Sequence, residues 1–588
     1  MLVNKYIRLT YTYYRRKSFA MNSQAKTGLA VGFIMCCASV GITGYLLFER
    51  QTALENKLAA IGDQTNSLAA NIDVLGEPTV VDKVVSTSQV WRPIQENVKD
   101  TVVQVFAHIA EMDLLQPYKT PNQGTANGSG FFINDRGDFI TNAHVVDQAR
   151  SVWIQIPSLG KRIIDVDVLS VSPERDLALL RVKPESLQVI KDILGSVPFL
   201  TLGDSDVLHR SDEILALGYP LGQQSLKSTT GVISGREQHL IQMSAALNPG
   251  NSGGPSLNNK GEVIGINAAN IPSAQNIGYL IPINDLKIVL DDLYKVKLLR
   301  KPFLGVLFNN ATDHLTEFLG NPAPGGCYVV EVVKGSTLDK AGIEGGDMIY
   351  EINGNRLDVF GEMAVAWSED KISIIDFVTR LSIGEDLHLV AYRKGSRKDV
   401  TVKFSQSELP AIRRVYPGYE KIDYEVFGGM VVMPLTLNHI HLMGSNASGL
   451  AKFAELKNQA CPKLIITHIF PDSQLFRART LAVGATINEL NGVEVHTLAD
   501  FRAAIKNHAT DKFLTMRVSD HVARASDNVF VTLPFDKVLQ EERKLALDYK
   551  YPLSSIAQDL FKAADANKAI VLARQAKDAK VVAPEVAA

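Results

Sequence analysis

Asn248-Pro249-Gly250-Asn251-Ser252-Gly253-Gly254-Pro255 is the stretch that decides the fold and the chemistry of this 588-residue chain. Its serine lies among glycines, which permit backbone conformations that a side chain would forbid. Such a loop can turn its backbone N–H groups toward one point, which is the arrangement that stabilises an oxyanion. The expected donors are the N–H groups of Gly250, Asn251 and Ser252. Taken alone, the motif more often marks an ordinary turn, so a general base must be found elsewhere.

The candidate base is His144, which follows two apolar runs joined by Asn134-Asp135-Arg136-Gly137. This turn predicts a β-hairpin, with His144 at the end of its second strand. Asp176 precedes the apolar run 177–182. A partly buried carboxylate needs a hydrogen bond, and a bond to one ring nitrogen of His144 would fix the tautomer. The chain order His144, Asp176, Ser252 is that of the chymotrypsin triad.

Three segments resemble the motifs of the HtrA/Deg serine proteases: Thr141-Asn142-Ala143-His144-Val145-Val146, Asp176-Leu177-Ala178-Leu179-Leu180 and Gly250-Asn251-Ser252-Gly253-Gly254-Pro255. The resemblance covers about residues 90–534. It implies an all-β dominated chain with a chymotrypsin-like double β-barrel, two PDZ (α+β) domains and an N-terminal transmembrane helix. One departure is Met243-Ser244-Ala245-Ala246, where the family usually has an aspartate at the second place. That change affects the expected support of the active-site loop, not the triad.

Composition excludes several classes of function. The formal net charge is −2 and no basic stripe with interleaved aromatic residues occurs, so no nucleic-acid partner is expected. The four cysteines form neither a disulfide framework nor a zinc spacing. No phosphate-binding loop with a Gly-Lys-Ser/Thr ending is present, so ATP is not required. We therefore expect neither a metal nor a cofactor.

The N-terminal part predicts a membrane anchor. Residues 1–26 carry six Lys or Arg and no acidic residue, and residues 27–48 carry no charge. About 20 apolar residues span a bilayer, and the positive flank stays in the cytoplasm, which places the rest outside. A cleaved signal peptide and a mitochondrial or other organellar address are the alternatives. Residues 49–89 carry a short heptad seam, which predicts either a self-associating stalk or a solvated helical linker.

Residues 90–300 form short apolar runs split by turns, as in β-barrels. His144 and Asp176 fall in the first half and Ser252 in the second, so the cleft is expected between two barrels. By resemblance, residues 268–276 form a specificity and activation loop, and this segment has no charged residue. A small apolar pocket, suited to aliphatic side chains, is expected from Ala246, Ile266, Asn267 and Ala268.

Residues 301–410 and 420–535 resemble two PDZ domains. In the first, the loop Phe303-Leu304-Gly305-Val306 would hold a peptide C-terminal carboxylate through its backbone N–H groups. The second copy opens at Phe427-Gly428-Gly429-Met430, in a run that resembles the long eukaryotic and plant Deg branch, and its peptide binding stays an open question. Asn353-Gly354 and Asn491-Gly492 are an internal repeat signal. Residues 536–588 are expected to be a helical and then loose tail.

The expected function is an ATP-independent serine endopeptidase that degrades unfolded or damaged proteins through an acyl-enzyme, under control of peptide C-termini at the first PDZ domain. The resemblance also implies a homo-oligomer built on trimers. Two alternatives are a regulatory protease with one signalling substrate and a chaperone or PDZ scaffold with little proteolytic activity. A closed first PDZ domain that only packs on the protease is a further alternative.

Overall fold

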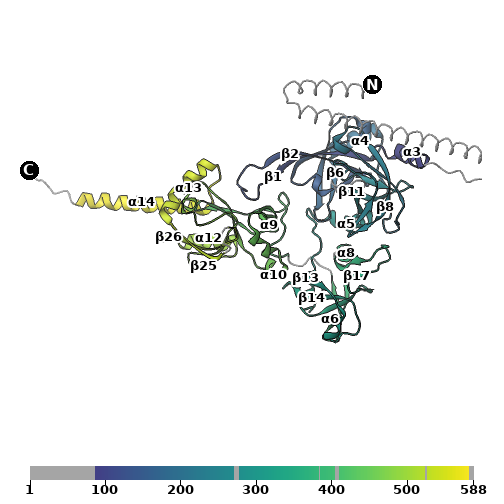
Figure 1. The fold of residues 1–588 in the computed structure, drawn as a ribbon. Coiled ribbons are helices and arrows are strands. Elements are labelled where there is room, and N and C mark those ends of the chain that lie inside the picture. The colour runs from purple at the N-terminus through teal and green to yellow at the C-terminus, as the bar shows by residue number, and fades with distance from the viewer. Residues whose placement is uncertain (1–86, 271–276, 383, 404–408, 523–525, 582–588) are drawn as a thin grey trace, which may run out of the picture. The chain divides into compact units, whose positions relative to one another are not determined.

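The computed structural model describes residues 87–581 except 271–276, 383, 404–408 and 523–525 (Figure 1). The predicted anchor and residues 49–86 of the predicted stalk lie outside the described residues. In the part of the chain that is described, no helix is long and apolar enough to cross a membrane.

The first barrel is closed, with strand order β1-β2-β3-β6-β5-β4. Side chains alternate along its strands, so that Phe132 and Phe139 are buried in the cluster of this barrel, whereas the adjacent Phe131 is buried in a different cluster. The turn Asn134-Asp135-Arg136-Gly137 joins β2 and β3 as an antiparallel pair, which confirms the predicted hairpin. The elements of this part are α3 (Thr87–Val98), β1 (Val102–Glu111), β2 (Asn122–Phe132), β3 (Asp138–Thr141), η2 (Ala143–Val145), β4 (Ala149–Gln155), η3 (Pro157–Leu159), β5 (Ile164–Ser172), β6 (Leu177–Val182) and α4 (Pro184–Leu194).

The second barrel is also closed, with strand order β10-β11-β12-β9-β8-β7. Its elements are β7 (Glu213–Gly218), η4 (Pro220–Gly222), β8 (Lys227–Glu237), β9 (Leu240–Met243), β10 (Pro255–Leu257), β11 (Val263–Asn270), β12 (Gly278–Pro282) and α5 (Ile283–Leu293). One apolar core contains residues of both barrels, such as Phe131 and Ile266. The double-barrel prediction is thereby confirmed.

The first β-rich domain (residues 306–403) has a sheet with the order β13-β14-β15-β19-β20, and β16 pairs with β15. Its elements are β13 (Val306–Asn310), α6 (Asp313–Phe318), β14 (Cys327–Val332), α7 (Thr337–Lys340), β15 (Met348–Ile352), β16 (Asn355–Arg356), β17 (Glu362–Met363), β18 (Ile372–Ser373), α8 (Ile374–Thr379), β19 (Asp386–Arg393) and β20 (Ser396–Lys403).

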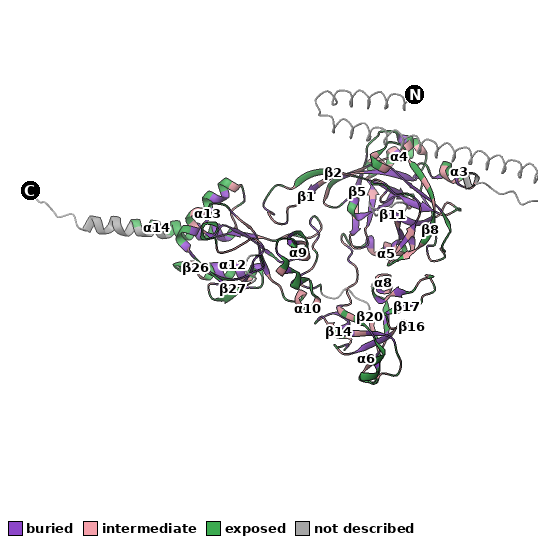
Figure 2. Cartoon of the chain, viewed as in Figure 1, coloured by how far each residue is buried: buried purple, intermediate pink, exposed green. Residues whose placement is uncertain are grey.

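The second β-rich domain (residues 425–534) repeats this order as β22-β23-β24-β26-β27, with one more strand, β21, at the edge. Its elements are β21 (Glu425–Phe427), β22 (Met430–Pro434), α9 (Leu437–Met443), η5 (Ser448–Ala454), α10 (Leu456–Gln459), β23 (Leu464–Ile469), α11 (Gln474–Ala478), β24 (Thr486–Leu490), β25 (Val493–Glu494), α12 (Leu498–Asn507), β26 (Phe513–Asp520) and β27 (Ser526–Pro534), followed by α13 (Phe535–Tyr549) and α14 (Ser555–Val581). Figure 2 shows buried residues gathered inside the barrels and sheets, whereas α13 carries both exposed and buried residues.

The internal repeat is visible in the turns. Asn353 and Asn491 have φ values of 48° and 47°, and each is followed by a glycine with φ near 80°. Each Asn-Gly pair closes the hairpin between a central strand and a two-residue strand, β15–β16 and β24–β25. Positive φ at both turn residues is the conformation that Asn-Gly favours.

The connection between β1 and β2 extends beyond the barrel and ends in the second β-rich domain. Leu114 and Tyr118 belong to one buried cluster of that domain, and the Tyr118 ring centroid lies 5.4 Å from that of Phe470. The Nε2–H of His439 donates to the Leu114 carbonyl oxygen over 3.2 Å. Burial lowers the pKa of His439 to about 4, so this ring is neutral and keeps the bond at physiological pH.

Candidate active site

The pairing of β3 with β6 places His144 beside Asp176. Thr141 at the end of β3 is opposite Ala178, so the residues just beyond each strand end meet. The ring Nδ1 of His144 lies 2.8 Å from Asp176 Oδ2 and 3.0 Å from Oδ1. The backbone N–H of His144 donates to Oδ1 over 3.0 Å, and Asn142 Nδ2 donates to the Asp176 carbonyl over 2.9 Å. His144 itself lies in η2, one turn beyond the predicted strand end.

The pKa of His144 is raised above its ordinary value of 6.5. Burial acts to lower it, but the hydrogen bond and the negative charge of Asp176 outweigh burial, and Asp147 adds a smaller charge effect. An imidazole held in this way is oriented by one nitrogen and can accept a proton at the other.

Ser252 lies on the loop between β9 and β10, which has two glycines in left-handed conformations. Gly250 has φ +100° and Gly253 has φ +85°, and a Cβ on either would overlap backbone oxygens of Tyr219 or Ser129. The loop therefore requires glycine at both positions. The Ser252 hydroxyl donates to the Ala268 carbonyl over 3.2 Å. His144, Asp176 and Ser252 line one open cavity of about 330 Å³.

Ser129 on β2 fixes this loop, and sequence reasoning missed it. Its backbone N–H donates to the Ser252 carbonyl over 2.8 Å, and its hydroxyl donates to the Gly250 carbonyl over 2.6 Å. The same hydroxyl accepts the Tyr219 N–H over 2.9 Å. One buried serine of the first barrel thus holds the serine loop of the second. Its only sequence signal was its place in Gly128-Ser129-Gly130 before an apolar run.

The prediction of three oxyanion donors needs correction. The Asn251 N–H donates to the Asn248 carbonyl over 3.0 Å inside the loop. A donor that is already used within a turn is not available to a substrate oxygen. This leaves the N–H groups of Gly250 and Ser252 as the candidate pair.

The predicted pocket is also only partly correct. Ala268 lines the cavity, together with Leu247, which the prediction did not include. The side chain of Asn267 points into the barrel, where it donates to the Leu217 carbonyl over 2.9 Å, and Ile266 is fully buried in the core. Ala246 is exposed and does not line the cavity. Alternation along β11 turns successive side chains to opposite faces, which explains the difference between Asn267 and Ala268.

Ser244, at the position where the resembled family usually has an aspartate, has a structural role. Its hydroxyl accepts the Val232 N–H over 3.0 Å, and its own N–H donates to the Val232 carbonyl over 3.0 Å. Ser244 therefore supports the start of the serine loop by binding β8.

A second, larger cleft of about 790 Å³ shares His144 and Asp176 with the first cavity. Its other walls come from the β1–β2 connection, the segment 414–419 and α9, among them Leu115, Arg414 and Leu442. Glu174, near Asp176, joins this wall because its carboxylate accepts the Tyr416 hydroxyl over 3.2 Å. The catalytic cavity thus continues toward the second β-rich domain.

The first β-rich domain contacts the loop of Asp176 through α8. Arg175, which is buried, donates to the carbonyl of Thr379 at the end of α8 over 3.1 Å.

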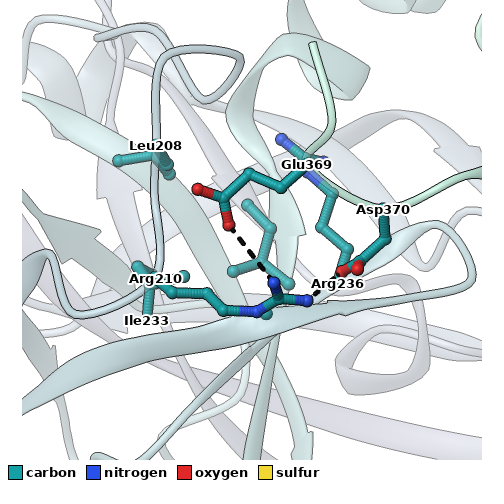
Figure 3. A pocket seen from close by; sticks show the side chains of 8 residues that line it. Leu208, Arg210, Ile233, Arg236, Glu369 and Asp370 are labelled. Carbon is teal, nitrogen blue, oxygen red and sulfur yellow. Dashed lines mark hydrogen bonds and ion pairs between the residues drawn. The ribbon is translucent and has the colours of Figure 1, made fainter. Parts of the chain in front are cut away.

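Arg380, the residue after Thr379, makes a second contact with the protease. It binds both carboxylate oxygens of Asp206 at 2.9 Å, and its guanidinium lies 3.9 Å from the Trp367 ring centroid. Figure 3 shows a more exposed contact nearby, where Arg210 lies against Glu369 and Asp370.

Metal-ligating side chains are scattered. Across the described residues, no group of three or more His, Cys, Asp or Glu side chains could hold a metal ion.

Comparison with known proteins adds independent observations. Residues 128–266 match the model of the trypsin-like peptidase domain. A probable periplasmic serine endoprotease DegP-like of Hahella chejuensis is 30% identical over 326 residues, which are 53% of this chain and 63% of that protein. A putative serine protease HhoA of a Synechocystis strain is 32% identical over 303 residues, 48% of this chain and 71% of that protein. A solved structure of the HtrA-type protease AlgW with a decapeptide is 24% identical and covers 54% of this chain and 99% of its own, with a TM-score of 0.42.

The fold and the His–Asp–Ser cavity are those of the trypsin-like serine peptidases. Within that class, the chain belongs to the HtrA/Deg family of serine proteases. It spans less than two thirds of the length of the Hahella relative.

Proposed function

We propose that the protein is a serine endopeptidase of HtrA/Deg type. The main support is the hydrogen bond of 2.8 Å between His144 and Asp176, because both residues line the same cavity as Ser252. Ser252 would attack the scissile carbonyl while His144 takes the hydroxyl proton and passes it to the leaving amine. The N–H groups of Gly250 and Ser252 would bind the oxyanion. Water would then hydrolyse the acyl-enzyme with His144 again as base.

The Ser252 hydroxyl donates to the Ala268 carbonyl rather than to His144. Attack requires this hydroxyl to turn toward the His144 imidazole, which lines the same cavity, and catalytic hydrogen bonds commonly tighten only when substrate binds.

The proposed substrates are unfolded or damaged polypeptides. The larger cleft can accept chain beyond the residues at the scissile bond, and its walls mix apolar and charged side chains. A folded protein cannot place an extended segment into such a cleft. Cleavage would proceed without ATP, because the sequence has no Gly-x-x-x-x-Gly-Lys-Ser/Thr loop.

The first β-rich domain is proposed as a PDZ domain that controls the protease. In the described residues β13 pairs only with β14, so its other edge can accept a peptide strand next to the loop Phe303-Leu304-Gly305-Val306. The helix α8 of that domain holds Arg175, the neighbour of Asp176. A bound C-terminus could therefore alter the Asp176 loop, provided that it has different affinity for two states.

For location and assembly, we propose a protein anchored by residues 27–48 with its protease outside the cytoplasm, as a homo-oligomer built on trimers. The charge asymmetry around residues 27–48 and the relatives named as periplasmic support the location. The family supports the assembly, which light scattering of the soluble form would measure.

Labelling with a fluorophosphonate, followed by a casein-cleavage assay, tests the proposed function. Wild type should label at Ser252 and cleave casein, whereas Ser252→Ala should do neither and should keep its thermal unfolding midpoint. Near wild-type cleavage by Ser252→Ala would refute the assignment. A folded wild type that neither labels nor cleaves would instead favour the scaffold alternative.

A further inference from the structure

Gly305 and Gly429 occupy equivalent positions in the two β-rich domains. Both are left-handed, with φ +71° and +79°, and both precede the first repeated strand, β13 or β22. A Cβ on Gly305 would overlap Ser336, and one on Gly429 would overlap Ser473. Each of these serines caps the helix that follows, α7 or α11. The second domain therefore has the same loop that is expected to bind a carboxylate in the first.

The two domains differ at the strand edge beside this loop. β13 has one partner within the described residues, whereas β22 is paired on both sides, with β23 and with β21. β21 runs antiparallel to β22, with Glu425 opposite Val432 and Phe427 opposite Met430. A peptide bound by strand addition would take this position and this direction, ending at the loop.

A side chain of the helix α12 also binds β21 in this position. Arg502 of α12 donates to the buried Glu425 carboxylate over 2.9 Å. The same guanidinium binds both oxygens of Asp423 at 2.8 Å and the Tyr424 carbonyl at 3.0 Å. The segment 423–427 is thus held by its pairing with β22 and by the Arg502 side chain of α12.

The carboxylate position of the same loop is filled by Glu542 of α13. The N–H of Gly428 donates to Glu542 Oε2 over 3.0 Å, and the Tyr551 hydroxyl donates to Oε1 over 2.8 Å. The side chain is completely buried. A carboxylate in such a place needs donors on its oxygens, and a loop N–H is what the terminus of a peptide would also receive.

We propose that the second β-rich domain contains a carboxylate-binding site for peptide ends that is occupied from within the chain. β21 takes the place of the peptide strand and Glu542 takes the place of its terminal carboxylate. Free C-termini then bind only at the first domain, and α13 is docked on the second domain as its ligand. The expected number of peptide sites per chain rests on the proposed function of the first domain, whereas the occupation of the second domain by Glu542 does not.

Burial and hydrogen bonding act in opposite directions on the ionisation of Glu542. Burial raises the pKa of Glu542 to about 7, and Glu425 acts in the same direction, while the bonds from Tyr551 and Gly428 oppose them. Arg502 binds Glu425 rather than Glu542, and the Glu542 bonds found among the described residues come from the Tyr551 hydroxyl and the Gly428 N–H. Tests are therefore made at pH 8, where Glu542 and added acetate are both ionised.

The first experiment replaces the carboxylate with a small molecule. Glu542→Ala leaves a cavity beside the Gly428 N–H, and thermal unfolding of the full chain is recorded with 100 mM acetate or 100 mM acetamide. We expect acetate to raise the unfolding midpoint of this variant by about 2–4 °C more than acetamide, the order of effect expected for a weakly bound ligand. If the variant folds only when the additive is present, soluble yield in acetate and in acetamide gives the same comparison.

Two controls separate cavity filling from general salt effects. Glu542→Gln retains a carbonyl acceptor and fills the space, and Asp548→Asn removes an exposed carboxylate from the same helix. Neither should respond differently to the two additives. Equal responses of Glu542→Ala to acetate and acetamide would overturn the occupation of a carboxylate site.

The second experiment counts sites by titrating the Ser252→Ala protein with a peptide that has a free apolar C-terminus, and with its amide. We expect one site per chain, selective for the free carboxylate and lost in Gly305→Ala. Two sites, or binding that survives in Gly305→Ala, would overturn the inference. Complete absence of binding would instead refute the proposed role of the first domain, while the acetate result still decides the occupation of the second.

Discussion

His144 is bound twice by the carboxylate of Asp176, through its ring Nδ1 at 2.8 Å and through its backbone N–H at 3.0 Å. The carboxylate therefore fixes both the main chain and the imidazole. It also fixes the tautomer, because Nδ1 must donate and Nε2 is left to accept a proton.

Asp176→Asn should lower kcat/KM by about 10³–10⁴-fold, because the ring loses the correct tautomer. Catalysis needs neutral His144, so activity rises with pH through its pKa. Since that pKa is raised above 6.5 in the wild type, the acid limb should lie above pH 6.5. Asp176→Asn removes the negative charge and the carboxylate hydrogen bond that raise the pKa of His144, so the acid limb of the profile should move to lower pH. The measurement is a pH profile of kcat/KM with a short chromogenic peptide.

Asp147→Asn is the comparison, since Asp147 raises the pKa of His144 by charge alone. It should shift the limb slightly to lower pH without the large loss of rate. An acid limb that stays in place in Asp176→Asn would contradict the role assigned to that carboxylate.

Ser129→Ala should lower kcat by about 10- to 100-fold with little change in KM, because misplacement of the catalytic loop by 1 Å is enough for such a loss. The hydroxyl that binds Gly250 and Tyr219 would be missing. Ser170→Ala is a matched control, because Ser170 is a buried serine of the same barrel whose hydroxyl has no hydrogen-bond partner among the described residues. Steady-state kinetics on both variants makes the test, and equal kcat values would exclude a positioning role.

The three catalytic candidates and the barrels could be predicted from the sequence because their signals are local. His144, Asp176 and Ser252 each lie in a short motif, and a turn such as Asn134-Asp135-Arg136-Gly137 specifies its own conformation. The Asn-Gly repeats were predictable for the same reason.

The remaining features depend on partners far away in the chain. Ser129 acts on residues about 120 positions later, and nothing near it in the sequence indicates that contact. The direction of Asn267 depends on the register of β11, which a shift of one residue would reverse. The carboxylate site of the second domain is filled by Glu542, which lies in a segment for which the sequence predicted only a helical tail.

Cleavage should occur after small or medium aliphatic residues such as Val, Ala and Ile. Leu247 and Ala268 line the cavity beside Ser252, and the Asp176 carboxylate, which also lines it, is already bound by His144, so a buried Lys or Arg would be left unpaired. Mass spectrometry of casein fragments maps the sites, and a preference for Lys or Arg would exclude this pocket. Leu247→Ala should extend cleavage toward Leu, Met and Phe, whereas Leu221→Ala, at an exposed residue outside the cavity, should leave the pattern unchanged.

Arg175→Met should uncouple the protease from the first β-rich domain. The guanidinium of Arg175 holds the carbonyl of Thr379 at the end of α8, and the next residue in the chain is Asp176. Methionine fills much of the same volume but donates no hydrogen bond, so a shift of α8 would no longer reach the Asp176 loop. In the wild type, a C-terminal peptide should raise the turnover of a short reporter substrate. In Arg175→Met we expect this increase to be at least 5-fold smaller, while the affinity for the peptide is retained.

Arg210→Met is the matched control, because Arg210 also joins the two domains but does so at the surface, against Glu369 and Asp370 (Figure 3). Exposed ion pairs contribute about 0–1 kcal/mol, so the peptide response of this variant should remain near that of the wild type. The comparison is a titration of peptide against reporter turnover, with binding followed separately by fluorescence polarisation. If Arg175→Met responds to the peptide as Arg210→Met does, then control does not pass through α8, and the loops around Ser252 become the place to search. If Arg175→Met instead loses peptide affinity, the substitution has damaged the first domain itself, and the coupling assigned to Arg175 is refuted.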